Sequence, residues 1–292
     1  MNRMIIGVLL LLVFNSCAEN KNIFTSGNSI QLGTESTLDV ITWNIEKFPK
    51  QNDITIDYLV KLINSMNVDI IALQEIESET DFQFLINSLE NYDGIIANSA
   101  SFNINLAFLY SNNLEVESTY EIFTDDWWSF PRSPLVTHII WNEQDIYIIN
   151  NHFKANENDS TEDEARRKSA SENLEDYINE YLYGENVIIL GDLNDELNDS
   201  MNVFQNFIND STNYKFVDMD LAYGSKANWS YPGWPSHLDH ILITNELFDE
   251  FDNEGSSVQT LRLEEYFDNG WTEYENYISD HRPFGLSLKF NP

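Results

Sequence analysis

The chain has 292 residues, with 49 Asp or Glu against 15 Lys or Arg, so its formal net charge is −34. Such a surface repels phosphate polymers, which argues against a protein that binds nucleic acid by neutralising it and makes any such binding weak and salt-dependent. Hydrophobic residues make up 42% and aromatic residues 13%, which excludes a disordered acidic tail, and the few Gly and Pro favour one domain without a flexible linker.

The chain begins with a predicted secretion signal over residues 1–16. Arg3 precedes an apolar run from Met4 to Phe14, which is shorter than the roughly 20 residues that span a bilayer. Cys17, the only cysteine of the sequence, follows a small residue at the expected cleavage point. This pattern resembles a bacterial lipoprotein signal, so we expect a lipidated Cys17. An ordinary signal peptide with an incidental cysteine is the alternative.

This interpretation divides the chain into three parts. Residues 1–16 are the signal, residues 17–36 form a tether rich in Asn, Ser and Gly, and residues 37–292 form the domain. The protein is then secreted and held at a membrane in the cell envelope. A single cysteine excludes disulfides within the chain despite the oxidising compartment.

Strands and helices alternate through most of the domain before a strand-rich end. Apolar runs predict strands at 38–44, 69–74, 92–97, 105–110, 134–141, 145–151, 186–190, 239–243 and 284–290. Apolar residues at helical spacing predict helices at 53–66, 80–89, 161–181 and near 201–209. The third helix starts with a capping-box pattern, Thr161 and Glu164. The pattern indicates an α/β domain.

Polar residues stand where the apolar strands begin or end. Six such positions are Asn44 with Glu46, Gln74-Glu75, Asn151-His152, Asp192-Leu193-Asn194, His237 to His240, and Ser279-Asp280-His281. Each alone is as readily a turn residue or a hydrogen-bonded structural histidine. Together they supply one chemistry, with oxygen ligands for a hard divalent cation, imidazoles for proton transfer and amides to orient a phosphate. Because ligands bind at strand ends in α/β sheets, we expect them to converge.

The sequence around these positions resembles the endonuclease/exonuclease/phosphatase superfamily, which includes pancreatic deoxyribonuclease, abasic-site endonucleases and neutral sphingomyelinases. The resemblance covers about residues 38–290 and rests on six motifs in the family order: ITWNIEKF, IIALQEI, INNHFKA, VIILGDLND, SHLDHILIT and ISDHRPF. It implies a four-layer sandwich, in which two packed mixed β-sheets are flanked by helices and the site lies at one end of the sheets. It also implies hydrolysis of phosphodiester bonds with Mg²⁺, Mn²⁺ or Ca²⁺.

The resemblance also implies roles for individual residues. Glu75 is the expected principal metal ligand, with Asn44 beside it and Asp280 near the metal. Asp192 and Asn194 are expected to position the attacking water and a phosphoryl oxygen. These assignments suit phosphoryl transfer, which needs charge neutralisation and in-line positioning more than covalent chemistry.

Two histidines complete the implied catalytic set. His281 is the expected catalytic imidazole, oriented by Asp239, because an acidic partner fixes the tautomer of the ring. His152 is expected to contact the scissile phosphate or the leaving group, and Arg132 in FPRSPL resembles an arginine beside the phosphate in secreted members. The pancreatic nuclease type pairs a glutamate with the histidine equivalent to His152, whereas the corresponding stretch here, 102–105, contains asparagines. A role of His152 as general acid is therefore weakened.

The loops leave several interpretations open. The loop 156–164 (NENDSTEDE) is either solvated or a Ca²⁺ site, and its charge disfavours repair of abasic DNA. The aromatic residues Trp229, Tyr231 and Trp234 either stack on a base or sugar or pack on their own domain.

We weigh three functions. The first is an extracellular, membrane-tethered nuclease or phosphodiesterase acting on nucleic acid or nucleotides. The second is the same chemistry on a lipid head group or a small phosphoester. The third, a non-catalytic acidic surface lipoprotein that binds Ca²⁺ or a partner, is disfavoured by the complete motif set. The sequence does not define an oligomeric state.

Overall fold

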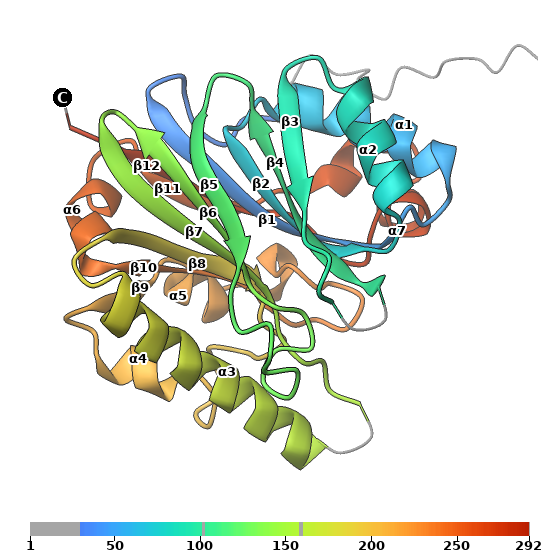
Figure 1. The fold of residues 1–292 in the computed structure, drawn as a ribbon. Coiled ribbons are helices and arrows are strands. Elements are labelled where there is room, and N and C mark those ends of the chain that lie inside the picture. Colours follow the sequence, from blue (N-terminus) through green and yellow to red (C-terminus); the bar gives the residue numbers. More distant parts are fainter. Residues whose placement is uncertain (1–29, 101–102, 158–159, 292) are drawn as a thin grey trace, which may run out of the picture.

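A computed structural model describes residues 30–291 except 101–102 and 158–159. Two mixed sheets of six strands pack face to face, and helices cover their outer faces (Figure 1). The predicted four-layer sandwich is thus confirmed. The expected signal peptide and Cys17 lie outside the described residues. Among the residues described, no helix is long and apolar enough to cross a membrane.

The first sheet has the strand order β11-β12-β1-β2-β4-β3. Its strands are β1 (Thr37–Phe48), β2 (Ile70–Ile76), β3 (Tyr92–Ile96), β4 (Asn105–Ser111), β11 (Ser257–Thr260) and β12 (Phe284–Lys289). The helices on its outer side are α1 (Asp53–Met66), α2 (Glu79–Ser88) and α7 (Trp271–Tyr277). β1 and β2 are parallel and joined by α1, which is the β-α-β opening expected from the sequence.

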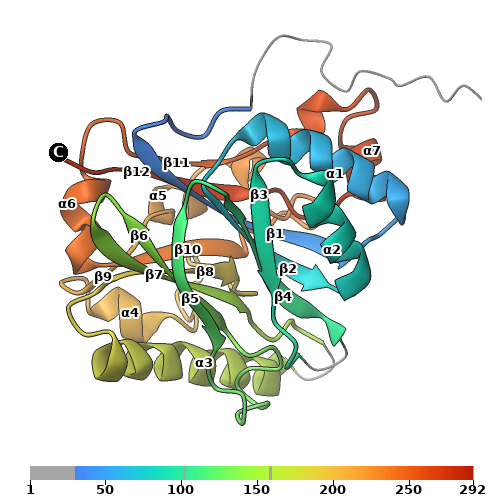
Figure 2. The ribbon, with the colours of Figure 1, turned by 45° about the horizontal axis from the view of Figure 1, so that its top comes forward.

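The second sheet has the order β5-β6-β7-β8-β10-β9. Its strands are β5 (Glu115–Glu121), β6 (Leu135–Trp141), β7 (Gln144–His152), β8 (Asn186–Asp192), β9 (Tyr214–Phe216) and β10 (Asp239–Thr244). Figure 2 shows α3 (Ser160–Tyr181) and α4 (Gln205–Asn209) on the side of the sandwich opposite α1 and α2. Short helical segments complete the chain: α5 (Met219–Ala222), η2 (Lys226–Asn228), η3 (Asn245–Leu247), α6 (Phe248–Phe251) and η4 (Leu263–Tyr266).

Three apolar cores lie between the four layers, because side chains alternate between the two faces of each strand. In β1, Ile41 and Trp43 pack in the core beneath α1 and α7, whereas Leu38 and Val40 pack in the core between the sheets. A third core joins the second sheet to α3. Strands buried on both faces explain the continuous apolar runs in the sequence.

The described part of the expected tether, residues 30–36, lies against the domain. Ile30 and Leu32 are buried in the core of the first sheet, and the amide of Gln259 in β11 donates to the Gln31 carbonyl. The packed domain therefore includes residues from at least Ile30 onward.

Candidate active site

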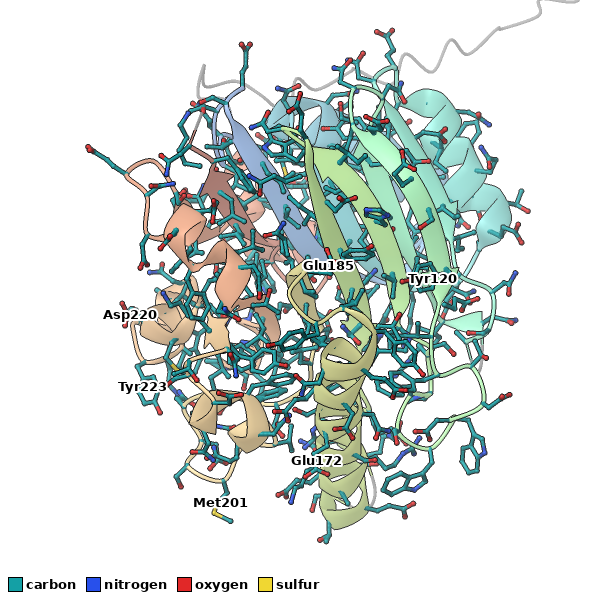
Figure 3. All side chains as sticks on the ribbon, turned by 60° about the vertical axis from the view of Figure 1, so that its left-hand side comes forward. Tyr120, Glu172, Glu185, Met201, Asp220 and Tyr223 are labelled. Atoms are coloured by element: carbon teal, nitrogen blue, oxygen red, sulfur yellow. The ribbon has the colours of Figure 1, made fainter. Side chains whose placement is uncertain are left out.

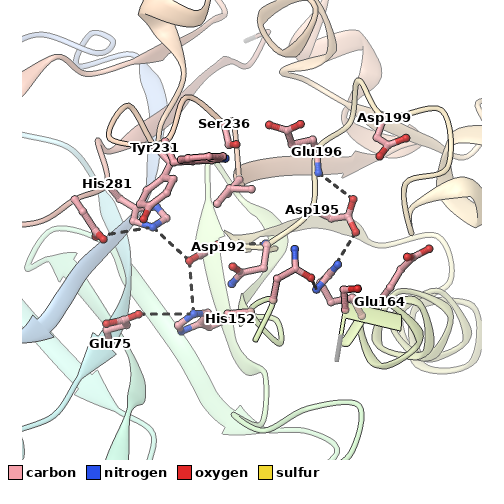
Figure 4. Close-up of a pocket in the computed structure, with 18 of the residues that line it drawn as sticks. Glu75, His152, Glu164, Asp192, Asp195, Glu196, Asp199, Tyr231, Ser236 and His281 are labelled. Carbon is pink, nitrogen blue, oxygen red and sulfur yellow. Dashed lines mark hydrogen bonds and ion pairs between the residues drawn. The ribbon is translucent and has the colours of Figure 1, made fainter. Parts of the chain in front are cut away.

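The polar strand-end residues meet at one end of the sandwich. The strand register sets His152 in β7 opposite Asp192 in β8, and Asp192 opposite Asp239 in β10. In the first sheet Asn44 of β1 is opposite Gln74 of β2, so the next residue, Glu75, reaches the same end. Figure 4 shows Glu75, His152, Asp192 and His281 around one cavity.

Close approach of two backbones places Asp192. Gly191 has φ +146°, and a Cβ built on it would lie 2.0 Å from the Asn151 carbonyl oxygen of β7. Any larger residue would push β8 away from β7. Burial raises the pKa of the adjacent Asp192 to about 7. The Asn194 amide N–H donates to Asp192 Oδ1 at 3.2 Å, and the Asn194 side chain donates to the Phe153 carbonyl at 3.1 Å.

Glu75 and Asp280 form the acidic side of the cavity. Glu75 has φ +65°, and its carboxylate accepts from Asn44 Nδ2 at 3.2 Å and from the Lys47 amide at 3.0 Å. The Asp280 amide donates to Glu46 Oε2 at 3.1 Å. Burial raises the pKa of Asp280 to about 6, and the charges of Glu46 and Glu75 act in the same direction.

Asn44 links the carboxylates. Its Nδ2 also donates to Asp192 Oδ2 at 3.0 Å, and its Oδ1 accepts from the Glu46 amide at 3.0 Å. In this arrangement Asn44 orients Glu75 and Asp192 through its N–H groups, and its role as a metal ligand stays a prediction.

His281 and Asp239 form a close pair. His281 Nδ1 lies 2.7 Å from Asp239 Oδ2, and His281 Nε2 lies 3.7 Å from Asp192 Oδ2. Burial lowers the pKa of His281, but the charges of Asp239 and Asp192 outweigh it and raise that pKa to about 10. The His281 amide is held by Ser279 Oγ, which itself donates to the Asn44 carbonyl. The ring is therefore fixed and carries positive charge at neutral pH.

His152 differs from His281 in having no acidic partner on its Nδ1. This atom is buried and has no hydrogen-bond partner among the residues described, whereas Nε2 lies 3.5 Å from Asp192 and 3.9 Å from Glu75. Burial lowers the pKa of His152 well below its ordinary value. Of the asparagines in the stretch 102–105, Asn105 donates to the Ile76 carbonyl. His152 is thus a neutral ring.

Arg132 is half-buried near the site. Its Nη1 donates to the Phe153 carbonyl at 3.5 Å. Burial lowers the pKa of Arg132, while the charges of Glu75 and Asp192 favour its ionised form. Arg132 is not one of the residues that line the cavity, so its contact with a bound phosphate stays a prediction.

A second buried cluster, which the sequence analysis did not predict, lies beside the site. Asp218 Oδ2 is 2.6 Å from His240 Nδ1 and 3.0 Å from His237 Nε2. His237 Nδ1 accepts from the Ser230 amide, so its proton is on Nε2, and His240 Nε2 faces the Asp195 carbonyl and is also protonated. The charge of His240 lowers the pKa of Asp218 against the effect of burial. Asp218 and His240 therefore form a hydrogen-bonded ion pair, and one ligand atom each of Asp218, His237 and His240 lies within 4.8 Å of the others. The only sign of this cluster in the sequence is the pair of histidines in SHLDHILIT, which are three residues apart.

A polar bridge between the sheets was also missed. Gln74 Nε2 donates to Asn150 Oδ1 at 2.8 Å, and Asn150 Nδ2 donates to the carbonyls of Leu73 and Ala107 at 3.0 Å. All these groups are buried just behind the site. They fix the spacing of the two sheets where Glu75 and His152 emerge.

The donor set suits a hard divalent cation. Glu75, Asp192, Asp239 and Asp280 bring four carboxylates together against the positive charges of His281 and Arg132. Burial is the main cause of the raised pKa values of Asp192 and Asp280, and the neighbouring carboxylates add to it. One oxygen or nitrogen atom each of Asp192, Asp239 and His281 lies within 4.8 Å of the others. Oxygen ligands without thiolates suit Mg²⁺, Mn²⁺ or Ca²⁺.

The model of the Endonuclease/Exonuclease/phosphatase family matches residues 41–281. The chain therefore belongs to this family, whose members hydrolyse phosphoester bonds with divalent metals. No curated protein matches the sequence.

Solved structures share the fold at low sequence identity. A humanised TDP2 of Danio rerio is 16% identical, with a TM-score of 0.67 over 87% of this chain and 100% of that chain. The human nocturnin catalytic domain is 18% identical, with a TM-score of 0.63 over 89% and 97%. A mannosyl-6-phosphatase of Bacteroides thetaiotaomicron is 14% identical, with a TM-score of 0.62 over 87% and 100%.

Proposed function

We propose that this protein hydrolyses phosphoesters at the cavity between Glu75 and His281, with Mg²⁺, Mn²⁺ or Ca²⁺ held by Glu75 and Asp280. The observation that carries the proposal is the convergence of these residues with Asp192 and the His281–Asp239 pair at one end of the sheets (Figure 4). The metal, when bound, polarises the phosphoryl group and neutralises its charge.

The side chains have distinct roles in this proposal. Asp192, 3.7 Å from His281, holds the attacking water and takes its proton, and Asn194 beside it orients a phosphoryl oxygen. The His281 imidazolium, kept in place by Asp239, stabilises the charge on the phosphoryl oxygens. Neutral His152 donates a hydrogen bond from its Nε2–H to a phosphoryl oxygen, and Arg132 adds a fixed positive charge.

A small phosphoester is the substrate class that the cavity favours. Seven carboxylates line it, those of Glu75, Glu164, Asp192, Asp195, Glu196, Asp199 and Asp280, against one guanidinium, that of Arg167. This excess of negative charge opposes a polyanion and tolerates a single phosphoryl group at the metal.

An extracellular nuclease is the second candidate. One structural neighbour, TDP2 of D. rerio, is described in complex with a single-stranded DNA product, and it shares 16% identity over 88% of this chain. This neighbour supports nucleic acid as an alternative substrate of the same catalytic residues. We further propose that the protein is a secreted lipoprotein anchored through Cys17.

A metal-activated substrate panel separates the two candidates. The substrates are plasmid DNA, RNA, sphingomyelin, bis-p-nitrophenyl phosphate and p-nitrophenyl phosphate, assayed at 0.05 and 0.3 M salt. We expect turnover of the small esters at both salt concentrations and poor cleavage of DNA that improves with salt, because the Debye length shortens from about 14 to 6 Å. Efficient cleavage of plasmid DNA at low salt would support the nuclease, and inactivity on every substrate would refute the proposal.

A further inference from the structure

The active-site cavity continues beyond the catalytic residues. Its volume is about 840 Å³, far more than one phosphoryl group fills. The carboxylates of Glu164, Asp195, Glu196 and Asp199 line the part away from Glu75 and His281 (Figure 4). We call the region formed by Glu164, Arg167, Asp195, Glu196 and Asp199 the acidic lobe. It is adjacent to Asp192 because Asp195 and Glu196 directly follow the end of β8.

Arg167 presents an unused donor to the acidic lobe. The residue is only 3% exposed, and its Nε donates to Asp195 Oδ2 at 3.1 Å. Its Nη1 donates to the Lys154 carbonyl and to Asn156 Oδ1. Its Nη2 makes no hydrogen bond with the residues described. Because Arg167 lines the cavity, the Nη2 hydrogens are left for a ligand.

The other groups of the acidic lobe accept hydrogen bonds. Glu164, Glu196 and Asp199 are carboxylates that accept only, whereas a guanidinium donates only. With Asp195 they give the lobe four negative charges against the one positive charge of Arg167, a balance of −3. The lobe therefore offers several acceptors and one fixed donor.

This mixture selects among leaving groups. A second phosphate would meet four carboxylates at close range, where repulsion in a partly desolvated site is large. A quaternary ammonium group could satisfy the carboxylates but would leave the Arg167 donor unpaired and facing a positive charge. A hydroxyl both donates and accepts, so a group with several hydroxyls satisfies both kinds of partner.

An exposed aromatic ring lines the same cavity. Trp234 is 78% exposed, in contrast to Trp229, which is 4% exposed and packs within the domain. Because Trp234 lines the cavity and does not pack within the domain, its ring is available to a ligand. The flat face of the indole suits the C–H face of a sugar ring.

We infer that the acidic lobe binds the leaving group of the substrate, and that this group is a neutral alcohol with several hydroxyls, such as a sugar, carrying one phosphoryl group. The inference rests on the proposed function and specifies its substrate class. In the reaction a bond forms between the water oxygen and phosphorus and the bond from phosphorus to the sugar oxygen breaks. The sugar oxygen takes one proton, and the second proton of the water remains with phosphate and solvent.

Turnover of matched substrates with the metal-loaded enzyme tests the inference. The substrates are a hexose 6-phosphate, phosphocholine, a deoxynucleoside 3′,5′-bisphosphate and p-nitrophenyl phosphate. We expect kcat/KM for the hexose phosphate to exceed that for phosphocholine by about tenfold or more, which is the effect of one hydrogen bond to a charged group. The bisphosphate should be the poorest substrate.

Variants locate the selectivity in the acidic lobe. Glu196→Gln and Trp234→Ala should each lower the ratio of kcat/KM for hexose phosphate to that for p-nitrophenyl phosphate by about 5- to 20-fold. Glu185→Gln is the matched control, because Glu185 is also half-buried but precedes β8 at its opposite end (Figure 3). The control should keep the wild-type ratio.

The outcomes distinguish this inference from the proposed function. Equal or better turnover of phosphocholine, or an unchanged ratio in both lobe variants, would overturn the sugar subsite while leaving phosphoester hydrolysis intact. Absence of turnover by the metal-loaded wild type on every substrate would instead refute the proposed function. Saturation-transfer NMR measures binding of the free hexose to the acidic lobe without turnover. We expect a signal with the wild type that weakens in Glu196→Gln. Absence of a signal with the wild type would overturn the inference.

Discussion

At the scale of single residues, one mutation separates catalysis from packing. His281 is buried, yet its ring points into the cavity with Nε2 near Asp192. A purely structural histidine would cost about 1–3 kcal/mol of stability on removal and leave turnover per folded molecule unchanged. Removal of a catalytic histidine would leave the stability nearly unchanged and lower turnover per folded molecule.

We predict that His281→Ala lowers turnover by about 10²- to 10⁴-fold with little loss of folded protein. Asp239→Asn should cost nearly as much, because it misorients the ring, and the double mutant should be little worse than either single mutant. His138→Ala is the control. His138 Nε2 lies 2.7 Å from Asp145 Oδ1, and neither residue lines the cavity. Turnover and melting temperature measured on the same preparations decide the matter; wild-type turnover in folded His281→Ala would show that the catalytic assignment is wrong.

At the scale of secondary structure, the sequence indicates elements that are buried and misses those that are not. Apolar periodicity predicts β1, β2, β7, β8 and β12, whose side chains are largely enclosed. It misses β5 (EVESTYE), an exposed edge strand with charged residues, and the short strands β9 and β11. These form by pairing with a neighbouring strand, and that long-range contact leaves no local pattern.

The site shows the same division. The residues expected to meet were found through motifs in the family order, since composition and spacing alone lead only to an α/β domain. The Asp218 cluster and the Gln74–Asn150 bridge escaped notice because their partners are 19 to 76 positions apart. Strand register, which a single sequence does not reveal, brings them together.

Burial of Asp69 just before β2 makes the stability of the folded protein depend on pH. Asp69 immediately precedes β2, and its Oδ2 accepts from the Asp39 amide at 2.8 Å. Burial raises the pKa of Asp69 from 3.8 to about 6, and the charge of Asp39 adds to this rise. Between these pH values the unfolded chain loses the proton while the folded chain keeps it, so the contribution to stability falls as pH rises through this window and is constant above it.

We therefore predict that Asp69→Asn stabilises the protein at pH 7 by about 1–2 kcal/mol. The side-chain oxygen of Asn can still accept the hydrogen bond from the Asp39 backbone N–H, and it carries no charge. The gain should shrink as pH falls toward 4, because near and below the unfolded pKa of 3.8 the carboxyl becomes protonated in the unfolded chain as well as in the folded one. Urea unfolding of both proteins at pH 4 to 7 measures it. A difference in stability that grows toward acid pH would contradict the assignment.

At the scale of the whole molecule, charge and anchoring bear on where the protein acts. A net charge of −34 keeps the chain soluble and repels polyanions. Expression with the intact signal should place the wild type in the membrane fraction, and Cys17→Ser should release it. Ser16→Ala, which keeps the thiol, is the control. Equal membrane association of wild type and Cys17→Ser would refute the lipoprotein proposal.

Phosphoester hydrolysis in this cavity is proposed to need a divalent metal held by Glu75. Mutation of a residue that only supports a metal ligand lowers metal affinity by about 10- to 100-fold. Removal of the charge of Glu75, a proposed ligand, should lower the affinity at least as much, and excess metal should then partly restore activity. Glu77→Gln is the control, because Glu77 is exposed and lies just after β2.

The direct measurement is turnover of bis-p-nitrophenyl phosphate against Mg²⁺, Mn²⁺ or Ca²⁺ concentration for wild type, Glu75→Gln and Glu77→Gln, with excess chelator as the zero point. We predict no activity in chelator, matching metal curves for wild type and Glu77→Gln, and a curve for Glu75→Gln shifted to higher metal. Full wild-type activity in excess chelator would show that hydrolysis in this cavity does not need a divalent metal.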